Sequence, residues 1–77
     1  MVHAFIMVKT GPGESEPVRE SALQLGNVTE AHVVAGNYDV IVESDGTDVS
    51  DVLGVASNEL QSLEGVERTK TYVSLGS

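Results

Sequence analysis

The hydrophobic period of this 77-residue sequence changes repeatedly along the chain, and the order of the changes leaves few folds open. Residues Val2 to Lys9 form a nearly continuous apolar run, which is short and β-branched enough for a strand that is buried on both faces. From Glu14 the period becomes helical, with Ser15 as a candidate N-cap and Gly26 as the stop. The apolar stripe of this first predicted helix consists of Val18, Ala22 and Leu25.

A β-hairpin is predicted in the middle of the chain. Two β-rich stretches, Val28 to Ala35 and Tyr38 to Ser44, flank the pair Gly36-Asn37. This pair readily takes the positive φ angles of a tight two-residue turn, so we expect the two stretches to be adjacent antiparallel strands.

A second helical pattern follows, with Thr47 as the candidate N-cap and Gly65 as the stop. Gly54 interrupts it at a cost of about 1 kcal/mol relative to alanine. We interpret Gly54 either as a close approach of the helix to the sheet or as a tolerated imperfection. Residues Val66 to Leu75 form the last predicted strand. The stripe of the second helix consists of Val49, Val52, Leu53, Ala56, Leu60 and Leu63.

The resulting order, β-α-β-β-α-β, predicts one α+β domain over residues 1–77. Leu25-Gly26-Asn27-Val28 and Leu63-Glu64-Gly65-Val66 both run from a helix end through glycine into a strand headed by valine, so the two halves look like related βαβ units. Because each crossover is right-handed, the halves interleave into a four-stranded antiparallel sheet. The first and third strands lie at its centre and both helices on one face, which is the ferredoxin-like βαββαβ sandwich.

The other face of the predicted sheet is left without cover. Phe5 and Met7 point away from the even-numbered residues of the first strand, and Val40 and Val42 oppose Ile41 in the third. Both faces are therefore apolar at the centre, and an exposed apolar face is a binding surface. We expect a homodimer that packs its sheets about a two-fold axis, with Phe5, Met7, Val40 and Val42 in the interface.

The charge of the chain restricts its partners. Twelve acidic and four basic residues give a net charge of −8, so nucleic acid is not expected as a direct partner. The surplus fits either an ordinary acidic domain or a halophilic protein of a haloarchaeon, whose charges are screened by concentrated salt. The first residues show neither a signal peptide nor a long apolar run, so we expect a cytoplasmic protein that does not interact with a membrane.

Catalytic and metal-binding sites are not indicated. Cysteine is absent from the sequence. His3 and His32 would lie on strands separated by another strand, roughly 9 to 10 Å apart by sheet spacing, which is too far for a shared metal ion. The sequence shows no set of nucleophile, base and orienting group, and Gly11-Pro12-Gly13 lacks the pattern of a phosphate-binding loop. We expect a protein that is not an enzyme and has no cofactor.

Asp39 is the polar residue that stands out. It begins a central strand that is otherwise apolar, where an unpaired carboxylate is costly if buried. It either binds backbone amides at the mouth of the hairpin or receives the ammonium group of a ligand. Thr69 and Thr71 share one face of the last strand and offer two hydroxyls side by side, although β propensity explains them equally well.

Three segments resemble, in the right order, the ligand-binding (RAM) domain of the Lrp/AsnC transcriptional regulators. Ala4-Phe5-Ile6-Met7-Val8 matches the opening strand, Gly36-Asn37-Tyr38-Asp39-Val40-Ile41-Val42 resembles the G-x-Y-D-hydrophobic hairpin, and Leu63 to Thr71 looks like the closing "GV…T-x-T" strand. The resemblance covers essentially the whole chain. It implies a dimer built through the sheets and higher assembly of dimers. It also implies an effector amino acid held between dimers by Gly36, Tyr38, Asp39, Thr69 and Thr71.

The function implied by this resemblance is that of an amino-acid-sensing, oligomerising module in transcriptional regulation. Full regulators of the family carry an amino-terminal helix-turn-helix, whereas the first strand here begins at Val2, so we expect no DNA-binding domain. The module would act by mixed assembly with full-length Lrp/AsnC regulators or by docking on another protein. The alternative is a pure docking module that regulates a transporter or enzyme without a ligand of its own. A small enzyme that oxidises an aromatic substrate is a third reading, but two tyrosines and one phenylalanine hardly line its cavity.

Overall fold

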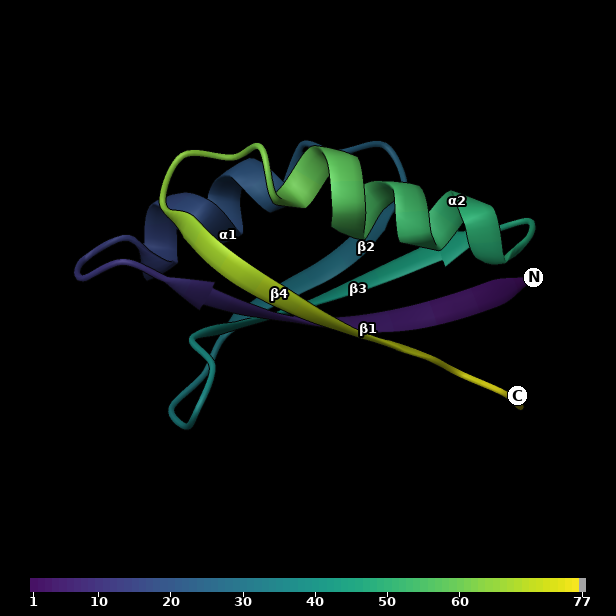
Figure 1. Cartoon of the computed structure of the whole chain (residues 1–77), viewed down its shortest axis with the longest axis horizontal. Coiled ribbons are helices and arrows are strands. Elements are labelled where there is room, and N and C mark those ends of the chain that lie inside the picture. The colour runs from purple at the N-terminus through teal and green to yellow at the C-terminus, as the bar shows by residue number, and fades with distance from the viewer. Residues whose placement is uncertain (77) are drawn as a thin grey trace.

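The chain folds in the predicted order of strands and helices (Figure 1). The structure is a computed structural model, which describes residues 1–76 except for the side chains of Ala56 and Ser57. The predicted place of Ala56 on the helical stripe lies outside the described residues. In chain order the elements are β1 (Val2–Thr10), α1 (Ser15–Leu23), β2 (Val28–Val33), β3 (Val40–Gly46), α2 (Val49–Gly54), the π-helix η1 (Val55–Leu60) and β4 (Val66–Val73).

The four strands form one sheet in the order β2-β3-β1-β4, and every neighbouring pair is antiparallel. The prediction that the first and third strands lie at the centre is therefore confirmed. Ile6 of β1 pairs with Val42 of β3 on one side and with Thr71 of β4 on the other. Because directly paired residues point to the same face, this register determines which side chains lie beneath the helices.

The helices lie over one face of the sheet (Figure 1), and the core lies between them and that face. Ala4, Ile6 and Val8 of β1 are fully buried, whereas Phe5 and Met7 between them point to the other face and are partly exposed. The core cluster contains Ile6, Val8, Val18, Ala22, Ala31, Val40, Val42, Val55 and Leu60.

The prediction that Val40 and Val42 belong to a dimer interface is wrong. Both pair with buried residues of β1 and are fully buried beneath the helices, where a second chain cannot reach them. Ile41, which pairs with Met7, is the apolar residue of β3 on the uncovered side.

Both predicted helix caps are displaced. Ser15 is the first residue of α1 and does not cap it, and its hydroxyl oxygen lies 3.0 Å from that of Thr10. The N-cap of α2 is Asp48 and not Thr47, because Asp48 has the extended backbone that a cap requires. Its carboxylate accepts the Asp51 N–H, and the Asp51 side chain accepts the Asp48 N–H, which makes a capping box.

The hairpin between β2 and β3 has the register of a two-residue turn but a longer loop. Val33 pairs with Val40, as a turn at Gly36-Asn37 requires, yet the regular ladder stops at this pair. The Val34 N–H closes the loop by donating to the Asp39 carbonyl at 2.9 Å. Positive φ angles are confined to glycines in the part of the chain that the structure describes, so the prediction of a tight turn with positive φ at Asn37 is wrong.

Two glycines differ in what a side chain would meet. A Cβ atom on Gly54, at the end of α2, would find nothing within 4 Å, so the interpretation of Gly54 as a close approach is wrong. Gly65, just before β4, has a φ angle of +95°, and a Cβ atom there would lie 3.0 Å from Val18 Cγ2. Only Gly65 of the two therefore needs to be glycine.

Alanine at these two positions should have opposite effects on the free energy of unfolding. Gly54→Ala should stabilise the chain by up to about 1 kcal/mol, because alanine is the better helix former and the space is open. Gly65→Ala should destabilise it by about 1–3 kcal/mol, because both the backbone conformation and Val18 oppose a Cβ atom. Urea unfolding followed by circular dichroism measures both changes, and shifts of the same sign would contradict this account.

Candidate functional site

The Asp39 carboxylate lies at the end of the hairpin loop, one residue before β3. Its Oδ2 accepts the Thr10 backbone N–H at 2.9 Å and lies 3.3 Å from Thr10 Oγ1 and 3.6 Å from Lys9 Nζ. The Thr10 N–H, and after it Lys9, hold the pKa of the Asp39 carboxyl below its ordinary value of 3.8, although partial burial acts in the opposite direction. The carboxylate thus binds a backbone amide, as one of its two predicted roles requires, and its side chain is still 28% exposed.

Asp39 and Lys9 help to line a pocket of about 400 Å³ that is open to solvent beside the start of α1. The pocket offers a carboxylate and an ammonium group 3.6 Å apart, which complement the two charges of an amino acid. Its lining consists of Lys9, Thr10, Gly11, Pro12, Gly13, Ser15, Asp39 and Glu67.

Gly36 and Tyr38 line a different pocket, of about 250 Å³, under the hairpin loop. Met7 and Ile41 contribute to it, so it lies on the side of the sheet that the helices leave uncovered. The Arg68 guanidinium lies 5.9 Å from the centre of the Tyr38 ring. This pocket is more apolar than the one at Asp39 and contains an aromatic ring with a cation beside it.

Thr69 and Thr71 pair with Val8 and Ile6 of β1 and therefore point toward the helix-covered side of the sheet. Thr69 Oγ1 accepts a hydrogen bond from Gln61 Nε2 at 3.1 Å. The structure consequently does not bring the five predicted ligand residues together within one chain: Asp39, the pair Gly36 and Tyr38, and the two threonines occupy three separate places.

The uncovered side of the sheet, which we call the open face, is apolar at its centre and divided by charge. It comprises His3, Phe5, Met7 and Lys9 of β1 and the side chains of the other strands that share this side. Phe5 is 37% and Tyr72 is 50% exposed. The half formed by β2 and β3 carries Glu30, Glu43 and Asp45, and the half formed by β1 and β4 carries Lys9, Arg68 and Lys70.

His3 joins two acidic residues of β3 on this face. Its Nε2 lies 2.9 Å from Glu43 Oε1, and its Nδ1 contacts Asp45 Oδ1. Hydrogen bonds to Asp45 and then to Glu43 raise the pKa of His3 above its ordinary value of 6.5. Neither acid is predicted as a site residue from the sequence, although alternation along β3 from Ile41 would have placed both on this face.

Comparison with known proteins identifies relatives over nearly the whole chain. Residues 3–77 match the family model described as the Lrp/AsnC ligand binding domain. An uncharacterised HTH-type transcriptional regulator of Pyrococcus horikoshii is 28% identical over an alignment of 74 residues, and the match covers 92% of this chain and 49% of the regulator. The chain thus spans about half the length of the curated relatives it matches.

Solved structures share the fold. A Thermus thermophilus protein superposes with a TM-score of 0.93 at 30% identity, over 100% of this chain and 96% of that one. A transcriptional regulator of Neisseria meningitidis, solved as a complex with L-Met, gives a TM-score of 0.83 at 19% identity, over 97% of this chain and 50% of that one. These sources do not support the predicted haloarchaeal origin. None of the helices in the described residues has the length and apolar character needed to cross a membrane.

The lowered pKa of Asp39 predicts how stability depends on acid. Because the folded chain favours the charged carboxylate, its contribution is fully present above the ordinary value of 3.8 and is lost as the pH falls through the lower pKa of the folded state. Asp39→Asn keeps an oxygen for the Thr10 N–H but removes the charge. The melting temperatures of the wild type and this variant should therefore converge below pH 3.8, and a difference that stays constant with pH would contradict the assignment.

Proposed function

Because the chain belongs to the Lrp/AsnC ligand-binding domain family, we propose that it is a self-associating regulatory module that senses an amino acid. It acts in the cytoplasm, in transcriptional regulation, through protein partners that include full-length Lrp/AsnC regulators. It performs no catalysis, and its output is a change in assembly.

The observation that carries the ligand proposal is the pairing of opposite charges beside the hairpin. An amino acid brings an ammonium and a carboxylate group, and Asp39 and Lys9 offer the matching charges in one solvent-open pocket. The L-Met complex of the Neisseria meningitidis regulator supports an amino acid as the class of ligand. The Tyr38 pocket and the two threonines would complete the site where chains meet, since within one chain they lie apart from Asp39.

Self-association is proposed through the open face. Phe5, Met7, Ile41 and Tyr72 give this face an apolar centre, and burying such a surface is the main source of stability for a small chain. The charges on either side of the centre favour a second copy of the chain as the occupant. A two-fold axis parallel to the strands brings the acidic half of one copy over the basic half of the other, and the reverse.

A pure docking module remains the alternative, and one observation favours it. The Asp39 carboxylate already has partners in Thr10 and Lys9, so a ligand must compete with contacts that the chain makes by itself. Without a ligand the same open face would serve only to assemble the chain with its partners.

Introducing a charge on the open face should separate the copies. Phe5→Glu should give a monomer, because it places a carboxylate in an apolar interface. The monomer should stay folded, because Phe5 lies outside the core cluster. Leu23→Glu is the matched control, since Leu23 is 39% exposed on α1, close to the 37% of Phe5. Light scattering at micromolar concentration should report a dimer or larger for the wild type and the control. A monomeric wild type, or equal effects of both changes, would contradict the proposed interface.

Amino-acid binding should depend on the Asp39 charge. Removing one charged hydrogen-bond partner costs about 1.5–3 kcal/mol, so Asp39→Ala should weaken binding about tenfold to a hundredfold. Calorimetry with each of the twenty amino acids at millimolar concentration measures this, and Glu20→Gln on the exposed side of α1 is the charge-matched control. If no amino acid binds the wild type, the sensor proposal fails and the docking module takes its place; unchanged binding by Asp39→Ala would show that the pocket is elsewhere.

A further inference from the structure

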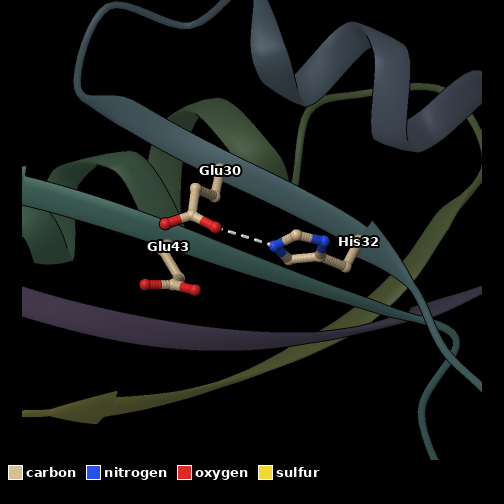
Figure 2. Close-up of side chains that lie close together, drawn as sticks. All are labelled: Glu30, His32 and Glu43. Carbon is tan, nitrogen blue, oxygen red and sulfur yellow. Dashed lines mark hydrogen bonds and ion pairs between the residues drawn. The ribbon is translucent and has the colours of Figure 1, made fainter.

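Three side chains of the types that bind metal ions lie close together on the acidic half of the open face (Figure 2). Glu30 and His32 come from β2, two residues apart and so on the same side of the strand, and Glu43 comes from β3. His32 Nε2 lies 2.9 Å from Glu30 Oε1, and one ligand atom from each of the three residues lies within 4.8 Å of the other two. The set therefore joins an imidazole and two carboxylates.

The two carboxylates face each other across the ladder. Glu30 pairs directly with Glu43, and like charges at directly opposite positions of neighbouring strands destabilise a sheet. The hairpin register runs unbroken from the pair Val33 and Val40 and brings Glu30 into this position, and it shifts only beyond Glu30, before Val28. A cation between the two carboxylates would remove this repulsion. A further contact holds the Glu43 carboxylate in position for such a cation.

That contact is His3, which supports Glu43 from the side away from β2. The His3 ring bridges Glu43 and Asp45, so the Glu43 carboxylate is held in place on a central strand and is only 21% exposed. Ligating carboxylates in metal sites are commonly fixed by hydrogen bonds of this kind. Glu30 and His32, at 55% and 56% exposed, stay free to adjust.

We propose that Glu30, His32 and Glu43 bind a divalent transition-metal ion of the zinc class. Zinc accepts imidazole nitrogen and carboxylate oxygen at about 2.0–2.2 Å, which puts tetrahedral ligands roughly 3.3 Å apart and requires only small rotations of the two exposed side chains. Three protein ligands leave the fourth position to water or to another molecule. An imidazole ligand favours zinc, nickel or copper over magnesium and calcium.

In the proposed dimer the basic half of a second copy is the competing occupant of this acidic half. His32 favours the metal ion over these basic side chains. Its ring nitrogen can coordinate zinc, whereas a Lys or Arg side chain would bind only the two carboxylates and gain nothing from the imidazole. Both β2 residues lie on an edge strand and are more than half exposed, so an ion can reach them from the side of the sheet. The metal site shares no residue with the pocket at Asp39, and in the dimer it competes with the basic residues of the second copy for the acidic half.

Calorimetric titration of zinc chloride into the full chain tests the proposal. The wild type should bind one zinc ion per chain, and magnesium should bind at least about tenfold more weakly. His32→Asn and Glu30→Gln should each weaken zinc binding at least about tenfold, as removal of a ligand requires. Both positions are exposed, so the variants should keep the circular dichroism spectrum of the wild type, and two independent variants keep the test valid if one fails to fold.

Glu64→Gln is the matched control, because Glu64 is an exposed carboxylate in the turn before β4 and its loss changes the net charge as Glu30→Gln does. It should retain wild-type zinc affinity. Equal weakening by Glu64→Gln and Glu30→Gln would show diffuse attraction to an acidic chain and overturn the proposal. A wild type that binds no zinc would also overturn it and would leave the basic residues of a second copy as the cations for this surface.

Discussion

Two short helices can cover only one face of a four-stranded sheet, and the rest of this structure follows from that limit. The covered face holds Ala4, Ile6 and Val8 of β1 beneath α1 and the helical segment from α2 to η1, and almost all of the fully buried apolar side chains lie there. A chain of 77 residues gains little stability from a core of this size. The same central strand places Phe5 and Met7 on the other side, so the open face keeps apolar surface whose burial requires something outside the chain.

The order of elements and the strand order can be predicted from the sequence because hydrophobic period and right-handed crossovers determine them. The pairing of Val33 with Val40 also follows from the position of Gly36-Asn37. The sequence does not show which face of β3 the helices cover. Alternation places Val40 and Ile41 on opposite faces, but it does not show which of the two packs against the helices. That choice depends on the pairing of Val40 with Val8, a contact between distant parts of the chain. The π-helix that follows Gly54 could not be predicted either, because the spacing of its apolar residues is also that of an ordinary α-helix.

The candidate sites show the same division between local and distant information. Asp39 can be recognised from the sequence as a lone carboxylate at the head of an apolar strand. Its partner Thr10 lies 29 residues away in the sequence, and no feature of the sequence around either residue predicts that they pair. The carboxylates near His3 and His32 were missed for a related reason: spacing alone places the two histidines too far apart, whereas the register puts Glu43 on the strand between them. The distance between the two histidines therefore predicts a metal site less well than the carboxylates on the strand that lies between them.

The central claim is that a second copy of the chain covers the open face. An isotope-filtered nuclear Overhauser experiment on a mixture of labelled and unlabelled chains tests it most directly, because it detects only contacts between copies. We expect signals from the Phe5 ring and the Met7 methyl group of one copy to open-face side chains of the other, including Ile41, because the proposed two-fold axis places β1 of one copy over β3 of the other. Signals confined to exposed helix residues such as Leu23 and Leu53, or no signals between copies at all, would contradict it.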